Sequence, residues 1–210
     1  MVPIPGLPYA TCDGPVSIND SGEVAGTWDD CADETPTSFL FAGGKLTTLK
    51  VWPNTGYELN DKGDVAGTTV VGTAGGSSAA SAIELANGTV ENLNSVTAGD
   101  SVTVQALNNQ DEAVGTEGTA TGSIGVAWIN GTATPVTSLL STPFSGTLDS
   151  AVDVNQEGTI LAFGTPTGTN TEHAYLLEAN GQQVSGKVYG TQSSDTSCTP
   201  PGGIGGFTCW

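Results

Sequence analysis

Apolar residues occur along this chain in short runs that end at Gly, Asn or Asp, and no stretch repeats them with the 3.6-residue period of a helix. The phrase LNDKGDVAGT at 59–68 shows the pattern, because apolar residues stand on both sides of a polar turn. Related phrases stand at 18–27, 107–116 and 154–163. This pattern predicts an all-β chain with almost no helix, in which the four phrases form hairpins.

Each phrase contains an asparagine that follows Ile, Leu or Val and precedes Gly or Asp by three positions. This spacing is typical of a hairpin loop in which Asn caps a type I turn and the fourth residue takes a positive φ. Asp111 replaces Gly in the third copy, and Asp is one of the few other residues that tolerates this region. A second glycine follows the Asn by seven in three copies, whereas the fourth copy has Ala162 there and Gly164 two residues later. The asparagines are Asn19, Asn60, Asn108 and Asn155, at spacings of 41, 48 and 47 residues.

A second kind of hairpin lies between the first ones, with an Asn-Gly or Gly-Gly turn between two apolar strands. It occurs at 38–49, 81–93, 126–136 and 174–184. Each repeat therefore holds four short strands, which is the signature of a β-propeller blade. We predict a single β-repeat domain, most simply a small propeller of four or five blades. Its repeats cover approximately residues 10–50, 51–97, 98–144 and 145–190.

The two phrases together resemble the repeat of the extracellular HAF-repeat proteins. That repeat reads approximately Ala-x-x-Ile-Asn-x-x-Gly-x-Val-x-Gly, followed by His-Ala-Phe-Leu-Trp-x-x-Gly. INDSGEVAG at 18–26 and LNDKGDVAG at 59–67 match the first half, and HAYLLEANG at 173–181 is nearest to the second half. The resemblance covers roughly residues 15–190. It implies a secreted or surface propeller and brings no shared catalytic motif.

Charge excludes several classes of partner. The chain has four lysines and no arginine against 22 acids, which gives a net charge of −18. Phosphate backbones and anionic lipid head groups bind through Lys and Arg, so we expect no nucleic acid or acidic membrane as a partner. No run of about 18 apolar residues occurs, so we expect no membrane insertion. A second copy, a neutral glycan, a surface protein and calcium remain as partners.

The four cysteines form two local pairs, Cys12 with Cys31 and Cys198 with Cys209. They lack the CxxC spacing of a zinc site, and an even count in a chain rich in Gly, Ser and Thr favours two disulfides in an oxidising compartment. Four free thiols are the alternative. The first residues lack the basic and apolar segments of a signal peptide. We therefore expect a secreted or cell-surface protein whose signal is absent from this sequence, with a disulfide-closed tail at 191–210.

Enzyme chemistry has little support in the sequence. His173 is the single histidine, and we expect it to be structural because the HAF repeat also has His at that place. No G-x-S-x-G elbow or phosphate-binding loop occurs. A pair of carboxylates, as in glycoside hydrolases, is the remaining route. Glu58 and Asp153 stand two positions before their motif asparagines and could face one axis from two units, although solvated strand residues explain them equally well.

The acidic patch DDCADE is the candidate calcium site, because closely spaced carboxylate oxygens suit Ca²⁺. It lacks the D-x-D-x-D-G spacing of a calcium loop, so we expect no obligatory cofactor. Its acids are Asp29, Asp30, Asp33 and Glu34.

Two tryptophans in expected loops, Trp28 and Trp52, are candidate stacking platforms for a glycan, whereas Trp128 lies in an expected core strand. Tryptophan does not recur at one position of the repeat, which argues against a multivalent lectin.

These observations favour a secreted, non-enzymatic structural or surface repeat protein that assembles through its termini. Both ends are apolar: VPIPGLP begins the chain, and Phe207 and Trp210 stand near its end. They either close their own ring or contact a neighbouring subunit. An extracellular glycan- or protein-binding module is the alternative, and a carboxylate-dependent glycosidase or lyase is the second alternative.

Overall fold

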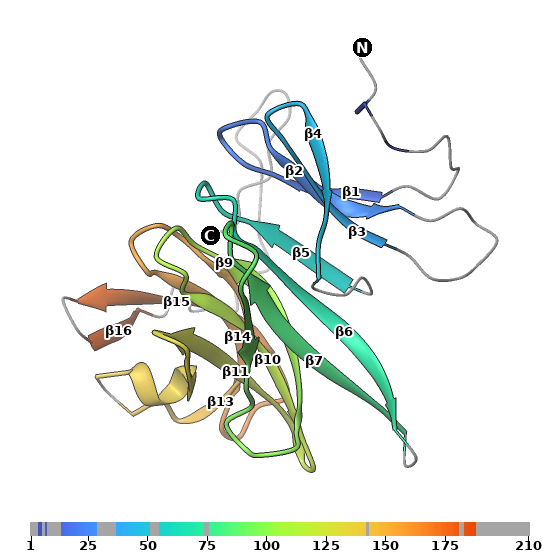
Figure 1. Cartoon of the computed structure of the whole chain (residues 1–210). Helices are drawn as coiled ribbons and strands as arrows, with labels where there is room; N and C mark the ends of the chain where they lie inside the picture. Colours follow the sequence, from blue (N-terminus) through green and yellow to red (C-terminus); the bar gives the residue numbers. More distant parts are fainter. Residues whose placement is uncertain are drawn as a thin grey trace, which may run out of the picture.

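Four antiparallel sheets of four strands each form the fold (Figure 1). The computed structural model describes residues 4–5, 7, 14–28, 37–50, 55–73, 76–141, 143–180 and 183–187. A 3-10 turn at Val136–Leu139, η1, is the one helical element in these ranges. The prediction of an all-β chain built from four-stranded units is therefore confirmed.

Every sheet contains four consecutive strands in chain order. Sheet 1 consists of β1 (Gly14–Ile18), β2 (Val24–Trp28), β3 (Thr37–Ala42) and β4 (Lys45–Thr48). Sheet 2 consists of β5 (Thr55–Leu59), β6 (Val65–Thr73), β7 (Gly76–Glu84) and β8 (Val90–Leu93). Sheet 3 consists of β9 (Ser101–Leu107), β10 (Ala113–Thr119), β11 (Gly122–Ile129) and β12 (Thr132–Pro135). Sheet 4 consists of β13 (Gly146–Val154), β14 (Ile160–Pro166), β15 (His173–Asn180) and β16 (Gln183–Lys187).

The motif asparagine caps the turn between the first two strands of each sheet. In sheet 2, Oδ1 of Asn60 accepts hydrogen bonds from the backbone N–H groups of Lys62 at 3.0 Å and Asp64 at 2.9 Å. The other three sheets repeat this pair of hydrogen bonds. The predicted positive φ at the fourth position is confirmed in all four copies: Gly22 76°, Gly63 84°, Asp111 62° and Gly158 76°.

The second glycine of the phrase makes room for an irregularity in the first strand. A Cβ on Gly115 would lie 2.0 Å from the carbonyl oxygen of Thr103, opposite a register shift in β9. In sheet 4 the equivalent residue is Ala162, and the close approach occurs at Gly164, where a Cβ would lie 2.2 Å from the carbonyl oxygen of Thr147. The glycine is displaced because β13 carries an additional register shift at this place.

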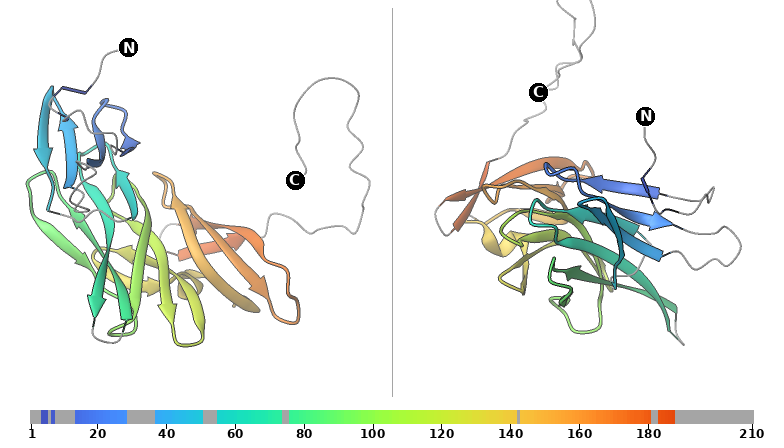
Figure 2. Two further views of the ribbon diagram at one scale, coloured as in Figure 1. Left: turned by 90° about the vertical axis from the view of Figure 1, so that its right-hand side faces the viewer. Right: turned by 45° about the horizontal axis from the view of Figure 1, so that its top comes forward.

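The sheets pack side by side in the order of the chain, with β1, β5, β9 and β13 as the strands that join each sheet to the next (Figure 2). Strand β5 contacts β1 and β2, β9 contacts β6 and β7, and β13 contacts β10 and β11. Within the described ranges, no comparable contact joins sheet 1 to sheet 4. The row of sheets is open, so the closed propeller predicted from the sequence is not confirmed.

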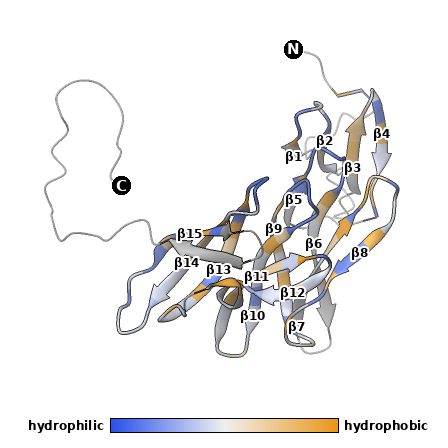
Figure 3. Cartoon of the chain, turned by 90° about the vertical axis from the view of Figure 1, so that its left-hand side faces the viewer, coloured by the Kyte–Doolittle hydropathy of each residue, from blue (hydrophilic) through white to orange (hydrophobic). Residues whose placement is uncertain are grey.

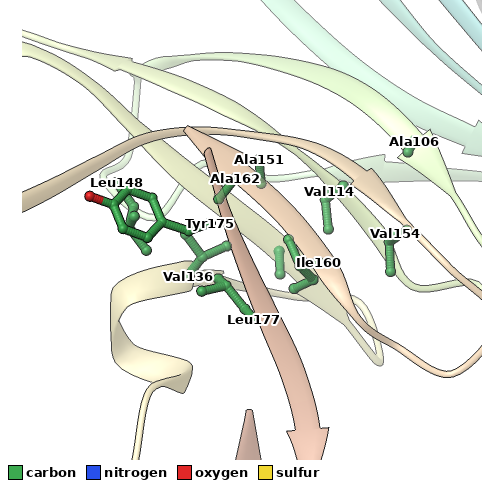
Figure 4. Close-up of a cluster of buried hydrophobic side chains, with 11 residues drawn as sticks. Ala106, Val114, Val136, Leu148, Ala151, Val154, Ile160, Ala162, Tyr175 and Leu177 are labelled. Atoms are coloured by element: carbon green, nitrogen blue, oxygen red, sulfur yellow. The ribbon is translucent and has the colours of Figure 1, made fainter. Parts of the chain in front are cut away.

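Apolar side chains fill the space between neighbouring sheets, and Figure 3 shows such residues on every sheet. The largest cluster joins Val114 and Ala127 of sheet 3 to Leu148, Ile160 and Tyr175 of sheet 4 (Figure 4). A second cluster around Trp128 joins sheets 2 and 3. Among the described residues, the cluster between sheets 1 and 2 is the smallest. Burial of each large side chain contributes about 1.5–3 kcal/mol, so these clusters stabilise the contacts between neighbouring sheets.

A ladder of asparagine side chains crosses all three junctions between sheets. Nδ2 of Asn19 donates to the carbonyl oxygen of Asn60 at 3.0 Å, Asn60 donates to Asn108 at 3.1 Å, and Asn108 donates to Asn155 at 3.1 Å. Each hydrogen bond runs from one sheet to the sheet that follows it in the chain. The same side chain therefore caps its own turn through Oδ1 and fastens the next sheet through Nδ2.

Replacing Asn60 by alanine should cost about 2–4 kcal/mol of unfolding free energy, because it leaves the buried N–H of Asp64 without its acceptor and removes the hydrogen bond to Asn108. Asn155→Ala is the matched control, since it removes the same turn bonds from an exposed residue that donates to no further sheet in the described structure. It should cost about 1 kcal/mol. Urea unfolding measures both, and equal losses would show that the inter-sheet hydrogen bond contributes nothing.

Candidate functional site

The position two residues before each motif asparagine lies on the joining strands and carries Ser17, Glu58, Ala106 and Asp153. Oγ of Ser17 accepts a hydrogen bond from the N–H of Leu59 at 3.2 Å, and Ala106 is buried between sheets 3 and 4. These two residues serve packing between sheets. Glu58 and Asp153 are left as the candidates for chemistry.

Glu58 is half-buried on β5, and this burial is the main reason why its pKa is raised to about 7. The second cause is repulsion by the carboxylate of Asp153 on β13. Asp153 is exposed, and its Oδ1 accepts a hydrogen bond from the N–H of Val154 at 2.8 Å. Two carboxyl groups from sheets 2 and 4 therefore interact electrostatically.

A carboxyl group with a pKa near 7 retains its proton in part of the molecules at neutral pH. Such a group can act as a general acid, and glycoside hydrolysis requires one together with a second carboxyl group. Glu58 and Asp153 are two carboxyl groups of the kind that this chemistry uses.

A pocket of about 230 Å³ lies beside sheet 2 but does not include this pair. Mostly small or polar residues line it: Lys50, Gly67, Thr69, Ala80, Ser81, Ala82, Val90 and Asn92. The ammonium group of Lys50 already donates to the carbonyl oxygen of Gly88 at 2.5 Å. Among the residues described, Lys50 is the one charged residue that lines this pocket.

The other candidates from the sequence are dispersed or lie outside the described residues. Trp28 was expected in a loop, but this is wrong: it ends β2 as a half-buried residue opposite Thr37. It is therefore not a fully exposed platform. The remaining candidates lie outside the described ranges: Trp52, Asp29, Asp30, Asp33, Glu34, Cys12, Cys31, Cys198 and Cys209. The disulfides and the calcium site stay predictions, and the described residues contain no group of three potential metal ligands.

His173 begins β15 and is half-buried. Its ring faces Tyr175 edge-on, with ring centroids 6.4 Å apart, and Tyr175 makes a similar contact with Phe144 at 5.0 Å. These contacts place the histidine in an aromatic group at the edge of the core.

Two buried glutamates that the sequence analysis did not single out hold the connections between sheets. Glu117 of β10 is completely buried, and its carboxylate accepts hydrogen bonds from the N–H groups of Val96 at 2.5 Å and Thr97 at 2.9 Å. Glu84 of β7 accepts one from the N–H of Lys50. No local motif marks these acids, because their partners are some 20 to 34 positions away in the sequence.

The first end of the row exposes an apolar residue that is buried in every other sheet. Leu59, Leu107 and Val154 directly precede their motif asparagines and pack against the preceding sheet, with exposed fractions of 8%, 8% and 6%. Ile18 is the equivalent residue of sheet 1, and 70% of it is exposed. The equivalent residue therefore packs against the preceding sheet at each of the three junctions, whereas Ile18 at the start of the row lacks this contact.

Comparison with known proteins supports the architecture and gives no family. The structure is similar to the crystal structure of TolB from Acinetobacter baumannii, a β-propeller protein, with a TM-score of 0.52 and 13% sequence identity. The match covers 83% of this chain and 43% of that chain, so this chain spans less than half the length of TolB. No protein-family model and no curated protein matches the sequence. The HAF-repeat resemblance stays a prediction. The described helical segments include none that is long and apolar enough to cross a bilayer.

The raised pKa of Glu58 predicts a specific dependence of stability on pH. The folded state holds this proton up to pH about 7, whereas an ordinary glutamate loses it near 4.5. The stabilising contribution of the protonated group is thus complete below pH 4.5 and is lost as the pH rises to about 7. Glu58→Gln should therefore raise the melting temperature relative to wild type more at pH 8 than at pH 4.

Glu91→Gln is the matched control, because it makes the same substitution at an exposed residue of β8. Its effect on the melting temperature should differ little between the two pH values. Equal behaviour of the two variants would contradict the assigned pKa of Glu58.

Proposed function

We propose that this chain is a secreted, non-enzymatic structural repeat protein that self-assembles through the open ends of its row of sheets. The observation that carries the proposal is the exposure of Ile18, at a position that packs against a preceding sheet in every other repeat. Contiguous exposed apolar surface marks interaction sites, and Ile18 together with the half-buried Val24 forms such surface at a position that packs in the other repeats. The even number of cysteines in two local pairs favours secretion.

A propeller-like arrangement of sheets supports the same proposal. Propellers contain about four to eight sheets, and closing the ring covers the faces that the terminal sheets would otherwise expose. The likeness to TolB supports this arrangement at the level of the fold. We propose that the four described sheets are part of such an arrangement and that further sheets complete it. The segments 1–3 and 188–210 lie outside the described residues, so the support comes from the sheets and not from the termini.

Charge determines the conditions under which assembly takes place. A net charge of −18 makes copies repel one another at long range. Salt reduces the range of this repulsion from about 30 Å at 0.01 M to about 3 Å at 1 M, whereas apolar contacts and hydrogen bonds persist. Association should therefore become stronger as the salt concentration rises.

Sedimentation velocity over a wide range of protein concentration tests the proposal. The expected result is a concentration-dependent increase in sedimentation coefficient that is larger at high salt than at low salt. Negative-stain microscopy of the assembled fraction should show rings or fibres of a regular unit. A chain that stays monomeric at every concentration and salt level would contradict the proposal.

A carboxylate-dependent glycosidase or lyase is the second candidate, and it is favoured by the Glu58–Asp153 pair. If this function is correct, the purified chain degrades a polysaccharide, and Glu58→Gln lowers kcat by about 100-fold or more because the general acid is lost. Glu91→Gln should leave the activity unchanged. A polysaccharide screen without activity at pH 5 to 8 would remove this candidate.

A further inference from the structure

The turn ends of neighbouring sheets share a second hydrogen bond beside the asparagine ladder. In each case the N–H of the residue after the motif asparagine donates to a side-chain oxygen at the equivalent position of the next sheet. Asp20 donates to Oδ1 of Asp61 at 2.9 Å, Asp61 to Oδ1 of Asn109 at 2.7 Å, and Asn109 to Oε1 of Gln156 at 2.9 Å. In both series the donor lies in one sheet and the acceptor lies in the next sheet along the chain. All three junctions therefore have the same donor-to-acceptor direction.

Sheet 4 ends both series with donors that have no acceptor among the described residues. Asn155 accepts from Asn108 and caps its own turn through Oδ1, but no residue in the described ranges accepts from its Nδ2. Gln156 accepts through its side chain, and its own N–H has no described acceptor. Both residues are exposed at the place where sheets 1 to 3 donate to the next sheet.

Sheet 1 carries the matching acceptors. The carbonyl oxygen of Asn19 receives the turn hydrogen bond from Gly22 at 3.0 Å and, among the described groups, no other. The carbonyl oxygens of Asn60 and Asn108 each receive a second hydrogen bond from the preceding sheet. The carboxylate of Asp20 is exposed and accepts from no described N–H.

The apolar contacts of the two ends match as well. On sheet 1, Ile18 is exposed and Val24 is half-buried, although the equivalent residues of the other sheets are buried against the preceding sheet. On sheet 4, Leu161 of β14 pairs with Leu176 of β15, and both are half-buried. Leu161 stands six positions after its motif asparagine. In the other sheets, the residue at this position is buried against the following sheet: Ala25, Ala66 and Val114.

We infer that a second copy of this chain docks its sheet 1 on sheet 4, in the register that joins the sheets within one chain. The donors of Asn155 and Gln156 then meet the carbonyl oxygen of Asn19 and the carboxylate of Asp20 in the second copy. Ile18 of that copy packs against the half-buried leucines of sheet 4. This inference rests on the proposed self-assembly and assigns its partner and its direction.

A second copy fits this end because the junction continues an interface that the chain already makes three times. The two surfaces are different, so the contact is head-to-tail, and successive copies form an open fibre unless the rotation closes a ring. Two copies together bring eight sheets, the upper end of the usual propeller range of about four to eight. A two-copy ring and a fibre contain the same junction.

Two variants block one end each. Asn155→Asp keeps the oxygen that caps the turn and replaces the donor by a carboxylate. Ile18→Asp places a charge in the apolar contact of the other end, at an exposed position where the fold tolerates it. Asn87→Asp and Val90→Asp are the matched controls, because they make the same changes at exposed positions away from both ends.

Each blocked variant should raise the dissociation constant of self-association by about 10-fold or more, whereas the controls should assemble like the wild type. The decisive sample is a mixture of the two blocked variants. The Asn155→Asp variant keeps a functional sheet 1, and the Ile18→Asp variant keeps a functional sheet 4. The mixture should therefore form a 1:1 complex of two 21.0 kDa chains. Light scattering after gel filtration measures this mass.

Assembly of the wild type without a 1:1 complex in the mixture would overturn the head-to-tail junction and leave self-assembly intact. Blocked variants that assemble like their controls would also overturn the head-to-tail junction and leave self-assembly intact, because the copies would then join through other surfaces. A wild-type chain that remains monomeric, with its open ends covered by another part of the chain, would overturn the junction and the proposed function together.

Discussion

The side-chain amide of one asparagine per repeat is the interaction on which the rest of the structure depends. Its oxygen accepts two backbone N–H groups of the turn, and its nitrogen donates to the carbonyl group of the next asparagine. Only an amide offers a strong acceptor and two donors on the same short side chain, whereas ionised Asp has no donor and Ser has a single donor on a shorter side chain. Local turn geometry and the packing of whole sheets are thereby joined at one residue, which explains why the phrase recurs.

Departures from the repeated phrase have physical reasons in the junctions between sheets. Asp111 replaces the usual glycine, and its carboxylate accepts from Nδ2 of Asn60 at 3.2 Å and pairs with Lys62 at 2.5 Å. The gain of these inter-sheet contacts compensates for the less favourable backbone conformation at a φ of 62°. The unusual residue therefore strengthens the connection between sheets 2 and 3.

The opposite side of each junction is less uniform than the turn side. Between sheets 2 and 3, the hydroxyl groups of Thr68 and Ser81 both accept from the N–H of Val104 at 3.0 Å. In sheet 3 the residue equivalent to Ser81 is Gly125, where a Cβ would lie 2.9 Å from a backbone atom of Ser150. One junction is thus filled by a polar cluster and the other by direct backbone contact.

The sequence alone determined the strands, the turns and their period, because these depend on neighbours within a few positions. Positive φ at Asp111 and the four two-hairpin units followed from turn chemistry and alternation. Glu58 and Asp153 were selected by their common place in the repeat, but their interaction and the burial that raises the pKa of Glu58 arise only when sheets 2 and 4 are in place. Only the tertiary structure decided that Ile18 is exposed whereas Leu59 is buried, and that the row stays open. The local sequence pattern is the same for a residue at a junction between sheets and for a residue at the end of the row. The two differ only in whether a neighbouring sheet packs against the residue.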